Sequence, residues 1–107
     1  PSLFLIGAED SWKGPDICAP KDENYEVFYR YAPLGTLELT LKDADHVQML
    51  DDPDRFGYHF CRVGSANSDA TRILSRGAVV AYLTERLLGQ PKTLTHLAPK
   101  GTLREKR

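Results

Sequence analysis

The stretch TLELTLKDADH, residues 36–46, alternates apolar and polar side chains over its first six positions and then breaks into a polar turn. A period of two predicts a β-strand, with the leucines on one face and Thr36, Glu38 and Thr40 on the other. Because one face is polar, we expect a half-exposed strand at or near the edge of a sheet. A histidine, His46, follows this strand directly.

A second strand is predicted near the start of the chain. Residues 3–6 form a short apolar run closed by Gly7, which is typical of a strand buried on both faces in a parallel sheet. Residues 8–23 are rich in Gly, Pro and charged side chains and predict a long loop. Asn24 is expected to cap a helix over residues 25–31. Two strands, each followed by a loop and a helix, predict the α/β class.

The longest predicted helix spans residues 69–88, with Asn67 or Ser68 as its N-cap and Gly89 as its stop. At 100° per residue, one face of this helix is predicted to pack on the sheet, and it holds Ile73, Gly77, Val80, Ala81, Thr84 and Leu88. We therefore expect a folded domain over residues 1–90 and a polar, extended or frayed tail over residues 91–107.

Composition excludes several function classes. Hydrophobic residues make up 41% of the chain and charged residues 27%, which predicts a globular protein. A net charge of −1 with scattered basic residues argues against nucleic-acid binding. No apolar run approaches the roughly 18 residues that cross a bilayer, so a soluble or peripheral protein is predicted. The chain opens on a buried-strand pattern without an initiator Met, and we expect it to come from the middle of a longer protein.

The two cysteines, Cys18 and Cys61, lack the spacing of a zinc or redox motif. The sequence leaves open whether they form one disulfide or remain two reduced thiols. Aromatic side chains also gather in the predicted loops. They could line a groove for an isoprenoid or a porphyrin, but loop aromatics more often anchor their loop to the core, and we expect that role for Trp12, Phe56, Tyr58 and Phe60.

Asp10 and His46 follow the two predicted strands directly. The carboxyl ends of parallel strands meet at one edge of a sheet, where reactive groups gather. In serine hydrolases a histidine removes the proton of the nucleophile and a carboxylate orients that histidine, in the chain order Ser, Asp, His of the α/β-hydrolases. Asp10 and His46 have the chain order expected for the aspartate and the histidine of this triad. The nucleophile motif Gly-x-Ser-x-Gly is absent, so the serine is expected outside the sequence.

Several blocks of the sequence carry a family resemblance. They are CAPK at 18–21, Asn24 with Phe28, KDADHVQMLDD at 42–52, Cys61, Arg72, GAVVAYL at 77–83 and Gly89. In this order and spacing, the blocks resemble the C-terminal portion of plant and algal chlorophyllases, which belong to the α/β-hydrolase superfamily. The string around His46 is the most specific of them.

The resemblance implies a fold, an activity and a setting. The fold would be the C-terminal part of an α/β-hydrolase, with its last two parallel strands, flanking helices and a long C-terminal helix. His46 would complete a Ser-Asp-His triad that cleaves the phytyl ester of chlorophyll to chlorophyllide and phytol without a metal cofactor. The implied partners are the N-terminal half of the hydrolase, in the same protein or a companion chain, and chlorophyll or another hydrophobic ester. A chloroplast location and peripheral membrane contact would follow.

Three points stay open. Chlorophyllases resemble lipases in taking the triad acid from an earlier strand end, upstream of this sequence, whereas Asp10 fits the commoner hydrolase pattern Gly-x-x-Asp. Asp45 stands where the family usually has a glycine, and its carboxylate would raise the pKa of the histidine or face solvent. A competing hypothesis from another class is a non-catalytic binding or structural subunit of a larger, photosynthetic assembly.

Overall fold

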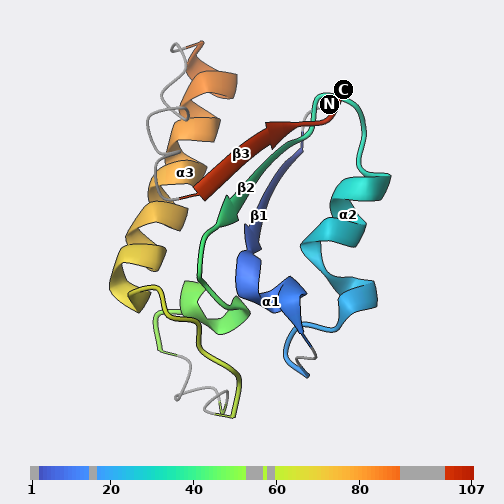
Figure 1. Cartoon of the computed structure of the whole chain (residues 1–107). Coiled ribbons are helices and arrows are strands. Elements are labelled where there is room, and N and C mark those ends of the chain that lie inside the picture. The colour runs from blue at the N-terminus through green and yellow to red at the C-terminus, as the bar shows by residue number, and fades with distance from the viewer. Residues whose placement is uncertain (1–2, 15–16, 53–56, 58–59, 90–100) are drawn as a thin grey trace.

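The computed structural model describes residues 3–14, 17–52, 57, 60–89 and 101–107. Three strands, β1 (Phe4–Ala8), β2 (Leu37–Leu41) and β3 (Gly101–Glu105), form one sheet in the order β1-β2-β3 (Figure 1). The predicted parallel pairing of the first two strands is confirmed, with Ile6 opposite Leu39. β3 runs antiparallel to β2. The chain is therefore a small mixed α/β structure.

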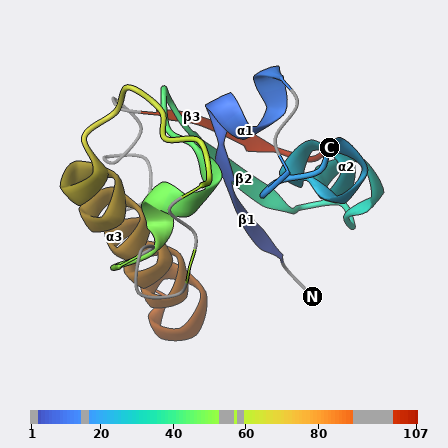
Figure 2. The same ribbon diagram turned by 90° about the horizontal axis from the view of Figure 1, so that it is seen from below.

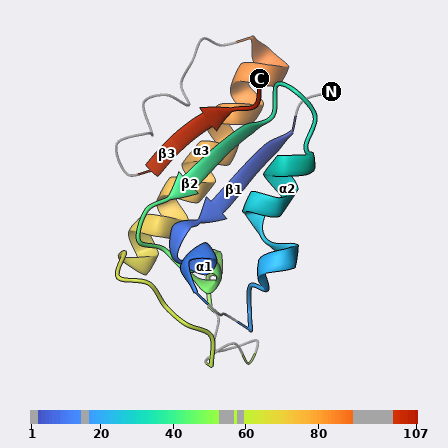
Figure 3. The same ribbon diagram turned by 45° about the vertical axis from the view of Figure 1, so that its right-hand side comes forward.

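Helices cover both faces of this sheet (Figures 2 and 3). The helical elements are α1 (Glu9–Lys13), the 3-10 turn η1 (Lys21–Glu23), α2 (Tyr25–Tyr31), the 3-10 turn η2 (His46–Met49) and α3 (Ser68–Leu88). α1 and η1 therefore occupy much of the segment predicted as a long loop. The predicted caps are confirmed, because the Oδ1 atoms of Asn24 and Asn67 accept backbone N–H groups and Gly89 is left-handed at φ 66°. None of the described helices is both long and apolar enough to cross a membrane.

The apolar core lies between α3 and one face of the sheet. Leu39 and Leu41 of β2 are each 1% exposed and meet the small side chains Ala78 and Ala81 of α3. The ring of Tyr82 stacks on that of Phe4, with centroids 4.8 Å apart. Alanine at the contact positions lets the helix backbone approach the leucine face of the strands closely.

The predicted packing face of α3 is confirmed at Ala81, is partly buried at Gly77 and Thr84, and was wrong at its three large apolar residues. Ile73, Val80 and Leu88 are 69%, 63% and 72% exposed. The buried face instead holds Thr71, Ser75, Ala78, Ala81 and Tyr82. The hydroxyl groups of Thr71 and Ser75 are hydrogen-bonded within the helix, because Thr71 donates to the carbonyl of Asn67 and Ser75 to that of Arg72. Hydroxyl groups that are hydrogen-bonded within their own helix can be buried. The polarity of serine and threonine therefore does not show which face of α3 is exposed.

The expectation that β2 is half-exposed was also wrong, because in the described sheet it lies between β1 and the edge strand β3. Its polar side chain Glu38 is fully buried. Residues 91–107, expected as an extended or frayed tail, include β3, whose register places Arg104 opposite Glu38. The polar face of β2 is thus covered by α2 and by a charge from β3 rather than by water.

A cluster of charges fixes β3 and α2 to β2. Arg104 Nε donates to Glu38 Oε2 at 2.7 Å, and Arg104 Nη2 donates to Glu26 Oε1 at 2.9 Å. The hydroxyl of Thr40 donates to Glu38 Oε1 at 2.7 Å, and the Arg104 guanidinium lies 3.9 Å from the ring centroid of Tyr29. Burial raises the pKa of the Glu38 carboxyl, although Thr40 and Arg104 partly offset it.

Two further contacts hold α2 against the sheet. The Tyr25 ring lies so close to β1 that a Cβ atom on Gly7 would come within 2.4 Å of it, which requires glycine at that position. Burial, with the negative charges of Glu26 and Glu38, raises the pKa of the Tyr25 phenol to about 12. At the other end of α2, Lys106 Nζ donates to the carbonyls of Tyr29, at 3.1 Å, and Ala32, at 2.8 Å. A cation at a helix C-terminus interacts favourably with the last carbonyls and with the negative end of the helix dipole.

Candidate active site

Asp10 and His46 lie at the carboxyl ends of neighbouring parallel strands. Asp10 is in the first turn of α1, directly after β1, and His46 is the first residue of η2, shortly after β2. The two strand ends are joined where the Asp10 N–H donates to the Ala44 carbonyl at 2.9 Å. The carboxylate of Asp10 is 3.3 Å from Lys13 Nζ. Among the described residues, no hydrogen bond or ion pair joins a carboxylate to the His46 ring.

Asp45 holds the backbone of His46 rather than its ring. The Asp45 side chain is fully buried, and its Oδ1 accepts the His46 N–H at 2.9 Å. In return, Gln48 Oε1 accepts the Asp45 N–H at 2.7 Å, which completes a capping box at the start of η2. Of the two alternatives that the sequence left open for this carboxylate, exposure to solvent is contradicted by its burial. Its function in the structure is to fix the turn from which the imidazole projects.

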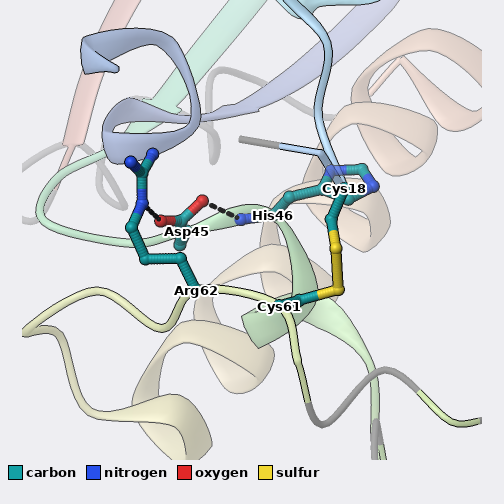
Figure 4. Close-up of a disulfide and its surroundings, with 5 residues drawn as sticks. All are labelled: Cys18, Asp45, His46, Cys61 and Arg62. Atoms are coloured by element: carbon teal, nitrogen blue, oxygen red, sulfur yellow. Dashed lines mark hydrogen bonds and ion pairs between the residues drawn. A yellow bond between two sulfur atoms is a disulfide. The ribbon is translucent and has the colours of Figure 1, made fainter. Parts of the chain in front are cut away.

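Arg62 links Asp45 to the other strand end. Its Nε donates to Asp45 Oδ2 at 2.5 Å, and its Nη2 donates to the Asp10 carbonyl at 2.5 Å. In Figure 4 the Arg62 guanidinium lies on one side of Asp45, and the His46 side chain leads away on the other side, toward Cys18. One guanidinium thus contacts the segments that follow both β1 and β2.

A disulfide joins Cys18 to Cys61, 43 residues apart in the chain (Figure 4). The sequence left open whether these cysteines are bonded to each other or reduced, and in the structure they are bonded. It ties the segment after α1 to the residue that precedes Arg62. Cys61 is buried, whereas Cys18 is half-buried and lies beside His46.

Gln48 fixes residues 61–68 against η2, a function that the sequence analysis missed. Its Oε1 also accepts the Gly64 N–H at 2.9 Å, and its Nε2 donates to the Ala66 carbonyl at 2.7 Å. A Cβ atom on Gly64 would lie 2.3 Å from the Asp43 carbonyl, so the approach requires glycine. The spacing Asp45-x-x-Gln48 is a signal that could have revealed the cap. The contact with Gly64 has no such signal in the sequence.

His46 borders two hollows of different character. The larger, about 480 Å³, is mainly apolar and is lined by His46 with Ile17, Cys18, Val47, Met49, Leu50 and Phe60. The smaller, about 240 Å³, contains the polar side chains of Ser11 and Asn24. Phe60 is 58% exposed, so the expectation that it anchors its loop in the core was wrong. Phe56 and Tyr58 lie outside the described residues.

Comparison with known proteins gives this arrangement a family. The sequence model of the chlorophyllase family matches residues 6–104, which is most of the chain. The chain belongs to the chlorophyllase family. It is 33% identical over 78 residues to Chlorophyllase-1 of Arabidopsis thaliana, a match that covers 68% of this chain and 24% of that protein. The chain thus spans about a quarter of the length of this relative. No solved structure gives a significant match.

Within the described residues of this chlorophyllase-family chain, no serine hydroxyl is hydrogen-bonded to the His46 ring. Ser11 lines the smaller hollow with His46, but it is buried and its Oγ donates to the Ala8 carbonyl at 2.6 Å. Its Oγ also lies 3.5 Å from Asn24 Oδ1. The bond to Ala8 joins α1 to the end of β1 and the contact with Asn24 joins it to the N-cap of α2, so Ser11 is part of the structural framework.

Three carboxylates, those of Glu9, Asp10 and Asp43, lie near one another, with ligand atoms within 4.8 Å. Lys13 Nζ lies 2.5 Å from Glu9 and 3.3 Å from Asp10. Its hydrogen bonds to both carboxylates raise the pKa of the Lys13 ammonium. Because an ammonium already pairs with two of the three carboxylates, we assign no metal to the cluster.

Proposed function

We propose that this chain supplies the catalytic histidine, His46, of a chlorophyllase-like serine ester hydrolase. The match of the chlorophyllase family over residues 6–104 carries the proposal. The position of His46 after β2, the second of two parallel strands, supports it, because reactive groups of open α/β sheets gather at the carboxyl ends of strands. The nucleophilic serine then comes from another segment, in the N-terminal half of the same protein or in a companion chain.

In this proposal the imidazole of His46 takes the proton of the serine hydroxyl as the serine attacks the ester carbonyl, and then gives it to the leaving alcohol. A carboxylate on the second ring nitrogen would hold the ring and stabilise its protonated form. Asp10 is one candidate for this acid. Its ion pair with Lys13 favours the other candidate, a carboxylate from the upstream segment.

The proposed substrate is chlorophyll or another hydrophobic ester, with chlorophyllide and phytol as the products from chlorophyll. The apolar hollow beside His46 supports a hydrocarbon-rich substrate, because burial of such a chain against Met49, Leu50 and Phe60 removes apolar surface from water. At its rim Ile17 is 80% exposed. A chloroplast location and peripheral contact with a membrane follow from the same proposal.

Two exposed surfaces of this chain support the proposal that another segment, the partner, packs against it. In the described part of the chain, β1 has a strand on one side only, whereas parallel strands are normally buried within a larger sheet. α3 exposes apolar side chains such as Val80 and Leu87, which are 63% and 76% exposed. Both surfaces are of the kind that an adjoining strand and helix would bury.

The test is His46→Ala in the full-length protein, with ester cleavage measured on chlorophyll and on a short p-nitrophenyl ester. Loss of the general base should lower kcat by roughly 10³- to 10⁵-fold, with the protein still folded. Arg76→Gln changes an exposed side chain on α3 and serves as the matched control, with no change in rate expected. Retained activity in His46→Ala would refute the proposal.

Labelling with a fluorophosphonate locates the serine. We expect the label on a serine of the longer polypeptide or of a companion chain. Absence of labelling from every chain that accompanies this one would support the non-catalytic subunit instead. The ratio of the rates on the two esters distinguishes a chlorophyllase from a general esterase.

A further inference from the structure

The turn that carries His46 depends on a buried charge. Asp45 is 0% exposed, and its two carboxylate oxygens accept bonds from the His46 N–H and from Arg62 Nε. A carboxylate removed from water is stable only when charged or strongly polar partners replace the water. The geometry of η2 therefore depends on the cation that neutralises Asp45.

Arg62 is suited to this because it contacts two segments at once. Its Nε reaches Asp45, and its Nη2 reaches the Asp10 carbonyl, each at 2.5 Å. A guanidinium presents separate N–H groups in a fixed plane, whereas a lysine ammonium is a single point charge. The same side chain thus sets the spacing between the segments that follow β1 and β2.

The backbone around Arg62 is itself fixed on both sides. The residue before it, Cys61, is bonded to Cys18. Two residues after it, the Gly64 N–H donates to Gln48 Oε1, and there is no space for a Cβ atom at Gly64. Anchors so close on either side limit where the guanidinium can move, although the Arg62 side chain is 41% exposed. Asp45 therefore meets a cation whose position is already restricted.

From these contacts we infer that Arg62, through its ion pair with Asp45, is a positioning residue that sets the orientation of His46 for the reaction. The inference rests on the proposed function of His46 as the general base. Arg62 does not touch the ring. It acts by holding the carboxylate that caps the turn, so its loss should let the imidazole take up unproductive orientations. Misplacement of a catalytic group by about 1 Å lowers a rate by roughly 10²-fold.

The experiment compares Arg62→Gln, Arg62→Lys and the control Arg76→Gln in the full-length protein. Arg76 also pairs with a carboxylate, that of Asp51, but both side chains are largely exposed. We expect Arg62→Gln to lower kcat per folded molecule by roughly 10- to 100-fold with KM changed less than about 2-fold. Arg62→Lys should recover part of kcat, because an ammonium still neutralises Asp45. Arg76→Gln should match the unmodified protein.

A purely structural contribution would give a different pattern. It would lower the thermal midpoint and the folded fraction while leaving kcat per folded molecule unchanged, and that result would overturn the inference. An equal loss in Arg62→Lys and Arg62→Gln would overturn it too. If Arg62→Gln fails to fold, the double variant Asp45→Asn with Arg62→Gln removes both charges of the pair, and an amide oxygen should still accept the His46 N–H. This variant should fold and retain more activity than Asp45→Ala, and equal activity would contradict the inference.

His46→Ala separates the two claims. If His46→Ala is inactive and Arg62→Gln keeps full kcat, only the inference about Arg62 fails. If His46→Ala remains active, the proposed function fails and the inference fails with it.

Discussion

Two buried carboxylates, one within β2 and one just after it, are neutralised by arginines that are held in different ways. Glu38 meets Arg104, which arrives on β3 and is fixed by hydrogen bonds and by the ring of Tyr29. Asp45 meets Arg62, whose neighbour Cys61 is covalently bonded to a distant segment. The first contact fixes a strand and the second fixes the turn that carries His46. The arginine that neutralises the sheet carboxylate is thus held by non-covalent contacts, whereas the arginine at the candidate site lies next to a covalent link.

Removing the covalent link should have the largest effect on stability. Because the disulfide closes a loop with a sequence separation of 43, loop entropy predicts that Cys18→Ser with Cys61→Ser lowers the free energy of unfolding by about 4 kcal/mol. Urea unfolding of the full-length protein measures this. A reducing agent should shift the unmodified protein to the same midpoint and leave the double variant unchanged. An unmodified protein that is insensitive to reduction would contradict the bridge.

Removing the arginine of β3 should have the next largest effect. Arg104→Gln leaves Glu38 buried beside no cation, and we expect a loss of about 2 to 3 kcal/mol, since Arg104 is 35% exposed and the pair is partly screened. The matched variant is Arg62→Gln, which should lower kcat per folded molecule more than Arg104→Gln does. Urea unfolding and kcat measured side by side would test the contrast. If the two variants lose the same free energy of unfolding and the same fraction of kcat, the two arginines do not differ in function.

The smallest effect is a pH dependence specific to Glu38. Burial raises the pKa of its carboxyl in the folded state above the usual 4.5, so the folded protein holds this proton more tightly than the unfolded chain. Below about pH 4.5 the carboxyl is protonated in both states, and its burial does not destabilise the folded protein through a charge. Above the folded-state pKa the carboxyl is ionised in both states, and the full destabilisation from the buried charge is present. Raising the pH through this window should therefore lower the stability of the unmodified protein relative to Glu38→Gln. Parallel stability curves for the two proteins would contradict the prediction.

Much of the fold could be predicted from local patterns. The two parallel strands follow from the apolar run before Gly7 and from the alternation after Thr36. The caps at Asn24, Asn67 and Gly89 follow from residue preferences at helix ends. These features depend on few neighbours in sequence, which is why the sequence alone indicates them.

Features that depend on distant partners were missed. β3 has one large apolar residue, Leu103, in a polar segment, so nothing local marks it as a strand. Glu38 looks solvent-facing because the alternation records polarity and cannot record that Arg104, 66 positions away, covers it. At the candidate site, His46 was identified from its place after a strand. The link from Arg62 to Asp45 could not be, because it depends on how residues 61–64 fold back onto η2.

The outward face of α3 has a practical consequence for anyone who handles this polypeptide. Ile73, Leu87 and Leu88 are each more than two-thirds exposed, and clustered apolar groups in water drive association. A preparation of these 107 residues by themselves is expected to self-associate as its concentration rises. Co-expression with the upstream segment, or a mild detergent, should therefore improve its solubility.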